Sequence, residues 1–283
     1  MNEATPLVSP VPALVNRIDH LSLQGPVFIS DLHLTAHRPR TLQRFLDFID
    51  QLAAPVKELV ILGDLFEFWA GDDALDGADA DDAAGATVTQ ALAAVVDRGI
   101  AVYLMHGNRD LLLGGSFLAR SRAQLLADPC LALLGGGSGD SAAPGEPVSV
   151  LLAHGDAYCT LDLPYQAFRR QARDPAFQAG FLRQPLAQRR ALIGKARAKS
   201  EAGKQQTAME IMDVTPEAVA AALRAAGVQR LLHGHTHRPA HHEFALDGSA
   251  AHRWVLTDWE LEATPARGGG LQWRDGDFHA LKA

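Results

Sequence analysis

The 283-residue chain has an ordinary globular composition, with 47% hydrophobic and 21% charged residues. This composition excludes collagens, coiled coils and wholesale disorder, and the length suits two domains or one large α/β domain with an insertion. The net charge of −7, taken alone, argues against a nucleic-acid partner or an anionic membrane. The charge is uneven, however. Residues 169–204 contain ten Lys and Arg against two Asp and Glu, so a segment of net charge +8 lies within a body of −15.

Two cysteines, Cys130 and Cys159, are too few for a disulfide framework or an all-cysteine zinc site, and they suit a reducing cytoplasm. The apolar runs fall far short of the roughly 18 residues that a membrane span needs. The first 20 residues contain an early acidic residue, three prolines and no continuous apolar stretch, which is not a signal-peptide pattern. We expect residues 1–25 to form a loosely ordered extension.

Short runs of apolar and β-branched residues, each followed by turn residues, predict strands that are buried on both faces. They cover residues 27–30, 59–63, 101–106, 148–153, 230–233 and 253–257. Helical patterns occupy 41–52, 87–98 and 215–226, the last with Thr215 as N-cap and Pro216 in the first turn. Alternation of strands and helices predicts a layered α/β fold.

Three segments interrupt this alternation. Residues 71–85 contain six Asp among Ala and Gly, and we expect a solvated acidic loop there. Residues 135–147 are rich in Gly, Ser and Pro and predict a loop between strands. Residues 158–212 lack any strand-like run, which predicts a helical insertion of about 50 residues, a cap, on a core formed by 26–157 and 213–283.

Polar side chains follow five of the predicted strands. Ligands in α/β proteins bind at the carboxyl ends of strands, so these side chains are expected to converge. They offer two carboxylates, one amide oxygen and four imidazoles: Asp31, His33, Asp64, Asn108, His154, His235 and His237. Such mixed nitrogen and oxygen ligation suits Mn²⁺, Fe²⁺, Co²⁺ or Zn²⁺.

Seven donors are too many for one open catalytic ion, but they suit two divalent ions that share a carboxylate. A pair of ions is what two-metal phosphoester hydrolysis requires. The alternative, in which each polar group is satisfied separately, is reasonable for one histidine but poor for seven residues together. That alternative applies to the other histidines. His233, for example, lies inside a predicted strand and is expected to be a core residue.

The five blocks, in order, resemble the DxH…GD…GN…H…GHxH pattern of the calcineurin-like metallophosphoesterase superfamily. This resemblance implies that one ion is held by Asp31, His33, Asp64 and His237. The second ion would be held by Asp64, Asn108, His154 and His235, with Asp64 bridging. Asp110, Asp156 and Arg238 adjoin these ligands and are expected to orient them.

Many members of the superfamily have histidine after the asparagine of the third block, where this chain has Arg109. Arginine has a pKa above about 12 and cannot act as a general acid at neutral pH. It can instead bind a phosphate with two parallel hydrogen bonds. Arg109 therefore favours a substrate whose leaving group needs little protonation, such as one released from a pyrophosphate bond. The alternative for Arg109 is a surface ion pair.

Longer strings are similar to the UDP-2,3-diacylglucosamine pyrophosphohydrolase family of the Gram-negative lipid A pathway. They are SDLHL, GDLFEFWAGDD, HGNRDLLLG, HGDAYCTLDLPYQAFR, IMDVTPEAV and HGHTHRPAHH, and the similarity spans residues 28–259. It implies a four-layer αββα sandwich with a helical cap, usually with Mn²⁺. It also implies water attack on the α-phosphorus of a UDP-linked diacylated glucosamine lipid, giving UMP and 2,3-diacylglucosamine 1-phosphate (lipid X). Catalytic roles would fall to Asp64, Asn108, Arg109 and His235.

The same resemblance implies substrate contacts in the cap as well as the core. In the cap these are Asp162, Tyr165, Ser200 and Lys204, and in the core Asn108, Arg109 and His235. Relatives often carry a lysine near the position of Thr207, so this chain departs from the pattern there. The basic, apolar cap is expected to hold acyl chains and to lie on the cytoplasmic face of the inner membrane. Spacing alone favours the alternative, a cap packed on itself with solvated charges.

Two other functions are compatible with parts of this pattern. One is a calcineurin-like phosphodiesterase that acts on soluble or cyclic nucleotides. The other is a non-catalytic metallophosphoesterase scaffold. The intact donor set argues against the scaffold, and Arg109 and the basic cap argue against the soluble substrate. No sequence feature indicates a nucleic-acid partner or an obligate protein partner.

Overall fold

A computed structural model describes residues 17–135, 146–204 and 211–283, the side chains of 199–204 excepted. Its strands are β1 Ile18–Leu23, β2 Pro26–Ile29, β3 Glu58–Leu62, β4 Ala101–Met105, β5 Gln124–Leu134, β6 Val148–Ala153, β7 Arg230–His233, β8 Ala240–Leu246, β9 Ser249–Val255, β10 Gly269–Arg274 and β11 Asp277–Lys282. Its α-helices are α1 Pro39–Asp50, α2 Ala80–Asp97, α3 Gly115–Ser121, α4 Leu163–Ala172, α5 Pro175–Leu182, α6 Leu186–Lys204 and α7 Pro216–Ala226.

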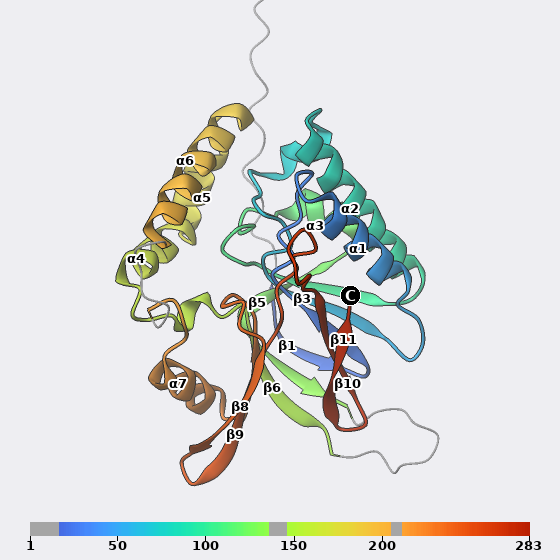
Figure 1. Cartoon of the computed structure of the whole chain (residues 1–283), viewed down its shortest axis with the longest axis vertical. Helices are drawn as coiled ribbons and strands as arrows, with labels where there is room; N and C mark the ends of the chain where they lie inside the picture. The colour runs from blue at the N-terminus through green and yellow to red at the C-terminus, as the bar shows by residue number, and fades with distance from the viewer. Residues whose placement is uncertain (1–16, 136–145, 205–210) are drawn as a thin grey trace, which may run out of the picture.

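The strands form one curled sheet in the order β11-β10-β2-β3-β4-β5-β6-β7-β9-β8, with β1 paired to β5 (Figure 1). β2, β3 and β4 are parallel to one another. The long strand β5 connects the two halves of the sheet, because its residues 124–126 pair with β4 and its residues 130–134 pair with β6. β6 runs antiparallel to β5, and β7 is parallel to β6.

Alternate residues of the central strands face two different cores, as expected for strands that are buried on both sides. In β3, Leu59 and Ile61 pack against α1, α2 and α3, whereas Val60 and Leu62 face the space between the two halves of the sheet. On the other half, Leu151 of β6 packs with α7 in a third core. Helix, sheet, sheet and helix are thus stacked in layers, which confirms the predicted αββα fold class.

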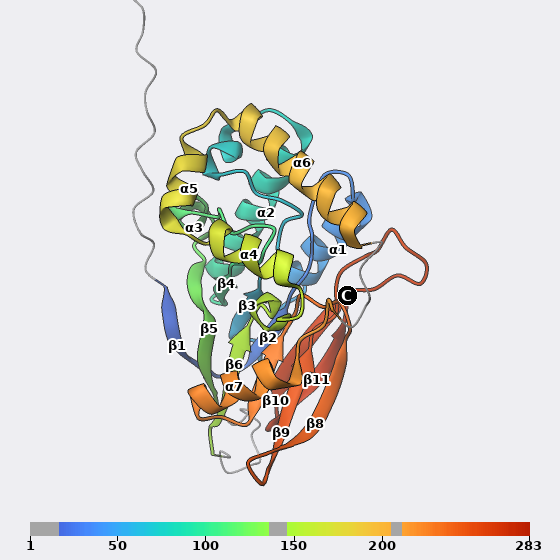
Figure 2. The same cartoon turned by 90° about the vertical axis from the view of Figure 1, so that its left-hand side faces the viewer.

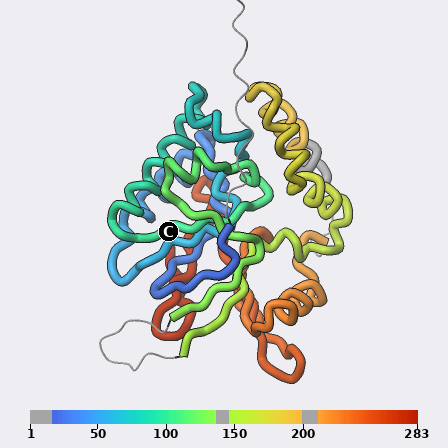
Figure 3. Tube along the Cα trace, turned by 180° about the vertical axis from the view of Figure 1, so that it is seen from behind, coloured from blue at the N-terminus to red at the C-terminus, as the bar shows by residue number. Residues whose placement is uncertain are grey.

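Helices α4, α5 and α6 follow β6 and precede α7, in the region predicted to be a helical cap. α4 packs on α5 and α5 packs on α6, and the three form an arm beside the strand ends (Figures 1 and 2). From behind, the arm stands opposite α1 and α2 (Figure 3). Residues 205–210, which include Thr207, lie outside the described part of the chain.

Two predictions were wrong, one for the N-terminal residues and one for the acidic residues 71–85. Residues 18–23, assigned to the loosely ordered extension, form strand β1, whose apolar residues join the core between the sheet halves. Residues 1–16 lie outside the described residues. The predicted solvated acidic loop at 71–85 is instead a 3₁₀ turn, Asp72–Asp76, followed by the first turns of α2.

The acidic residues are ordered because they cap helices and bind cap arginines. Asp72 accepts hydrogen bonds from the backbone N–H groups of Gly114, Ser116 and Phe117 at the start of α3. Asp79 and Asp82 form a capping box at the start of α2. Carboxylates are favoured at helix N-termini, so an Asp-rich run between helices is a capping signal as well as a solvation signal.

Arg189 anchors helix α6 to the core. Only 2% of this large side chain is exposed. Its guanidinium pairs with Asp73 and donates to the backbone oxygens of Ala70 and Gln184. Replacement by alanine would leave these acceptors without their partner.

We expect Arg189→Ala to lower the free energy of unfolding by about 2–3 kcal/mol, because buried acceptors lose a charged donor. Chemical denaturation measures this change, and limited proteolysis should show earlier cleavage between residues 158 and 204. Arg183→Ala, at an exposed position on the same arm, is the control and should change the free energy by less than about 0.5 kcal/mol. Equal stabilities of the two variants would contradict the role of Arg189.

Candidate metal centre

The predicted ligands lie at the carboxyl ends of five strands, but not for the reason expected. β6 and β7 run opposite to β2, β3 and β4 within the sheet, so a shared strand direction does not bring their ends together. The curl of the sheet does so. The contact is direct: the backbone N–H of His235, after β7, donates to both carboxylate oxygens of Asp31, after β2, at 3.0 and 2.8 Å.

The structure brings all seven predicted donors together, in two groups. Asp31, His33 and His237 form one group, and Asp64, His154 and His235 form the other, with the donor atoms of each group within 4.8 Å of one another. The side-chain oxygen of Asn108 lies 3.1 Å from Nε2 of His154 and 3.0 Å from Nδ1 of His235, so Asn108 joins the second group.

The carboxylate of Asp64 faces both groups. Its Oδ1 lies 3.8 Å from Nε2 of His154, and its Oδ2 lies 3.8 Å from Nε2 of His33. The side chain is almost fully buried, and Oδ1 also accepts a hydrogen bond of 2.9 Å from the backbone N–H of Arg109. This is the arrangement that a carboxylate shared by two ions requires.

Five of the seven ligands have left-handed backbone conformations, which are uncommon outside glycine. Their φ angles lie between 50° and 66°, at Asp31, His33, Asp64, His235 and His237. Such strain costs on the order of 1–3 kcal/mol per residue and persists only where the surroundings enforce it. Here Asp31 N–H donates to the oxygen of Gly63, and His33 N–H to that of Asp64, so neighbouring strand ends hold each other.

Glycines provide the space for this packing. A Cβ atom on Gly107 would overlap both the side chain and the backbone of Asp64, and one on Gly234 would overlap Asp31 and Ser30. Gly63 has a φ of +89°, and its Cβ would lie 2.6 Å from Nδ1 of His154. The Gly-Asp, Gly-Asn and Gly-His pairs of the sequence therefore have a steric cause.

Partners on the outer nitrogens orient three of the imidazoles. Nδ1 of His154 donates to the backbone oxygen of Leu62 at 2.9 Å, and Nδ1 of His33 lies 3.0 Å from Oε2 of Glu67. Nδ1 of His237 is 3.7 Å from Asp258. A proton on Nδ1 leaves Nε2 with the lone pair that binds an ion.

Glu67 and Asp258 were not predicted from the sequence. Glu67 follows Asp64 by three residues in the same loop, and that closeness was the available signal. Asp258 lies after β9, beyond the last motif, and no pattern pointed to it.

The charges of the site favour cations. Burial alone would raise the pKa of Asp31, but the histidines at 237, 154 and 33 hold it well below its usual value. Burial alone would lower the pKa of His154, yet Asp64, Asp156 and Asp31 raise it to about 9. Burial and the neighbouring Asp64 raise the pKa of Asp110 to about 6. The raised pKa of His154 reflects the negative potential of these carboxylates, and a divalent cation that displaced its proton would be held by buried carboxylates and nitrogen donors together.

The predicted substrate contacts divide into three sets. Asn108, Arg109 and His235 lie at the metal centre itself. From the cap, the ring of Tyr165 stacks on His235 with centroids 5.8 Å apart, and its hydroxyl donates to Asp156 at 2.7 Å. Asp162 serves as N-cap of α4, accepting from the backbone N–H of Tyr165. The side chains of Ser200 and Lys204 lie outside the described residues.

The flanking residues have distinct contacts. Asp110 accepts from the backbone N–H groups of Leu65 and Gly107, and so shapes the loops that carry Asp64 and Asn108. Asp156 pairs with Arg169 and Arg173 of α4. Arg238 pairs with Asp213 at 2.8 Å. His233 is fully buried in β7 and is not in either donor group, as predicted.

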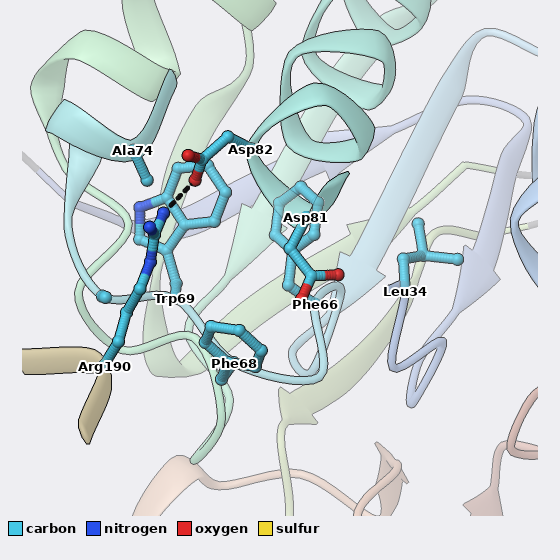
Figure 4. Close-up of a pocket in the computed structure, with 9 residues that line it drawn as sticks. Leu34, Phe66, Phe68, Trp69, Ala74, Asp81, Asp82 and Arg190 are labelled. Atoms are coloured by element: carbon cyan, nitrogen blue, oxygen red, sulfur yellow. Dashed lines mark hydrogen bonds and ion pairs between the residues drawn. The ribbon is translucent and has the colours of Figure 1, made fainter. Parts of the chain in front are cut away.

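A small hollow of about 20 Å³ lies between Trp69 of the core and Arg190 of α6 (Figure 4). That volume holds about one water molecule. No metal ligand lines it, and Trp69 is buried and stacked on Phe66. Trp69 is therefore a core residue, and the hollow is separate from the metal centre.

The family model for calcineurin-like phosphoesterases matches residues 27–239. This match covers most of the chain and every residue of the metal centre, so the chain belongs to the calcineurin-like phosphoesterases, a class of metal-dependent hydrolases.

Several curated relatives match the chain over most of its length, at 44–48% identity. A UDP-2,3-diacylglucosamine hydrolase of Aromatoleum aromaticum is 48% identical over 244 residues, which is 86% of this chain and 93% of the relative. Proteins of the same name from Cellvibrio japonicus and Pseudomonas aeruginosa are each 44% identical, covering 89% and 83% of this chain and 99% and 91% of theirs. Within its class, the chain is a member of the UDP-2,3-diacylglucosamine hydrolase family.

Among solved structures, a Vps29 mutant from Entamoeba histolytica aligns with 92% of this chain and 98% of its own, at 13% identity and a TM-score of 0.39.

None of the helices in the described ranges combines the length and hydropathy needed to span a bilayer.

We expect Gly107→Ala to reduce bound metal from two equivalents to one or fewer, because the added methyl group displaces the shared carboxylate of Asp64. Elemental analysis of dialysed, Mn²⁺-loaded protein measures this stoichiometry. Gly115→Ala is the matched control, since a Cβ there meets no atom within 4 Å. Full metal content in Gly107→Ala would contradict the role assigned to this glycine.

Proposed function

We propose that the protein hydrolyses the pyrophosphate bond of UDP-2,3-diacylglucosamine, with water attacking the α-phosphorus, to give UMP and 2,3-diacylglucosamine 1-phosphate. The observation that carries the proposal is the pair of donor groups sharing Asp64, with Arg109 beside them. The names of the relatives support the substrate.

Two divalent cations, which we propose to be Mn²⁺, would be held by the seven donors with Asp64 between them. Bound there, they supply Lewis-acid activation of water and stabilise charge on the phosphoryl oxygens. The chain's own contribution is orientation. The hydrogen bond of His154 with Leu62 and the 3.0 Å contact of His33 Nδ1 with Glu67 present each Nε2 to the centre.

We assign the binding of the diphosphate to Arg109. Its backbone N–H donates to Asp64, and its side chain is half-buried. Its Nε is buried without a hydrogen-bond acceptor among the described residues. A buried donor without an acceptor is costly, and a phosphate oxygen would satisfy it.

The arm of helices α4–α6 presents the apolar surface for the acyl chains. Large apolar side chains on or next to it are exposed by 42–71%: Leu161, Leu163, Phe168, Phe177 and Leu192. Exposed apolar residues of this kind mark lipid or protein contacts. We propose that they bind the acyl chains and attach the protein to the cytoplasmic face of the inner membrane.

The positive charge of residues 169–204 contributes less to the proposed membrane attachment than the sequence suggested. Of its eight basic residues whose side chains the structure describes, five form ion pairs with acidic residues of the core: Arg169, Arg173, Arg189, Arg190 and Arg197. Their charge is largely neutralised within the protein, so apolar contact is the main term in the proposed attachment.

Arg109→Ala is expected to lower kcat/KM by about 10-fold or more, in line with a lost charged hydrogen bond. Arg109→Lys should recover part of the loss, because lysine keeps the charge without the two-pronged geometry. Steady-state rates with purified, Mn²⁺-loaded variants test this. Wild-type rates for Arg109→Ala would exclude the phosphate-binding role.

The proposed reaction is tested by incubating the Mn²⁺-loaded protein with UDP-2,3-diacylglucosamine in ¹⁸O-labelled water. UMP should appear and carry the label. Label in the sugar phosphate would refute attack at the α-phosphorus, and absence of UMP would refute the reaction. A deacylated UDP-glucosamine is the control. An equal kcat/KM for it would indicate a hydrolase of soluble nucleotides instead.

A further inference from the structure

In the part of the chain that the structure describes, the core residue Glu67 connects helix α6 to one of the two metal groups. Glu67 lies in the loop after β3, and its two carboxylate oxygens have different partners. Oε2 is 3.0 Å from Nδ1 of His33, and Oε1 accepts a hydrogen bond from the guanidinium of Arg197 on α6. His33 belongs to the donor group with Asp31 and His237. The chain of contacts therefore runs from the arm to a metal ligand in two steps.

Glu67, which lies between Arg197 and His33, can pass a change in the position of one on to the other. Glu67 is only 14% exposed, so its ion pairs are shielded from solvent more than surface pairs are. The guanidinium of Arg197 also lies over the ring of Phe68, 5.8 Å from its centroid, which restricts its position.

Glu67 decides which nitrogen of His33 faces the donor group. Its carboxylate oxygen, 3.0 Å from Nδ1, favours the tautomer with the proton on Nδ1, and this tautomer leaves the lone pair on Nε2. Nε2 of His33 lies 3.2 Å from Nε2 of His237, so both nitrogens point to the same place. An ion bound there would hold His33 in the tautomer and orientation that favour its contact with Glu67. Glu67 would then be held in the position in which it binds Arg197.

We propose that Arg197 is a positioning residue that couples the docking of helix α6 to occupation of the Asp31–His33–His237 group by a divalent cation. The inference rests on the proposed function only through the metal ions, since it does not involve the lipid. Coupling between two binding events is reciprocal. The ion therefore strengthens the docking of α6, and the docked helix strengthens the binding of the ion.

The direct charge of the ion acts in the opposite direction, because a cation repels Arg197. That repulsion is weakened by the carboxylate of Glu67 between them, and by Asp31 and Asp64 beside the ion. We therefore expect the ordering of Glu67 to outweigh the repulsion and the coupling to be favourable.

Arg190 provides a matched comparison on the same helix. It is as exposed as Arg197, 27% against 28%, and it also binds acidic residues of the core, Asp79 and Asp82. Figure 4 shows Arg190 against Asp82. Asp79 and Asp82 cap α2, and among the described residues neither forms a hydrogen bond or ion pair with a member of the metal groups. Removal of Arg190 loosens α6 without touching the chain of contacts to His33.

The first test is Mn²⁺ affinity, measured by calorimetric titration of metal-free protein. Arg197→Gln should weaken binding of one of the two ions by about 5-fold or more, as expected for a lost outer partner of a ligand. Arg190→Gln should change it by less than about 2-fold, and Arg197→Lys should restore part of the affinity. In a Glu67→Gln background, Arg197→Gln should have no further effect. Equal affinities of Arg197→Gln and Arg190→Gln, or tighter binding by Arg197→Gln, would overturn the proposal.

The second test is the reciprocal one, by amide hydrogen exchange with and without Mn²⁺. Exchange of residues 190–198 should slow when Mn²⁺ is added to the wild type and to Arg190→Gln, but not when it is added to Arg197→Gln. Identical slowing in all three proteins would overturn the coupling. Neither test uses the lipid substrate, so the coupling and the proposed reaction can fail independently of each other.

Discussion

The Asp64 carboxylate is the constraint on which the rest of the structure depends, because it must face donors from both halves of a curled sheet. Three of the strands that supply the donors run in one direction within the sheet, and two run in the opposite direction. Their carboxyl ends meet because the sheet curls at β5. The local consequences are left-handed backbone at five ligands and glycines at the points of closest approach. Strain is concentrated at the site and held there by three well-packed cores.

Acidic and basic segments that are separate along the sequence are paired in the folded structure. The acidic residues 72–82 were expected to be solvated, and the basic residues of the cap were expected to face a membrane, but residues of the two sets bind each other. Arg189 pairs with Asp73, and Arg190 with Asp79 and Asp82. What remains exposed on the arm is largely apolar, which suits a substrate with acyl chains better than the net charge of the segment indicated.

The sequence predicted the fold class and the residues that the structure brings together in the two donor groups, because both depend on local patterns. The buried strands β2, β3, β4, β6 and β7 have continuous apolar runs, and each ends in a recognisable motif. β5, with Asp128-Pro129 in its middle, and the polar edge strand β8 have no such runs and were missed. Residues whose roles depend on distant partners, such as Glu67 with Arg197, carry no local signal.

Two ions are expected to share Asp64 between the two donor groups, and anomalous diffraction from crystals of the Mn²⁺-loaded protein would locate them. We expect two anomalous peaks, one beside Asp31, His33 and His237 and the other beside Asn108, His154 and His235, with an oxygen of Asp64 in contact with each. A single peak, or two ions without Asp64 between them, would contradict this expectation.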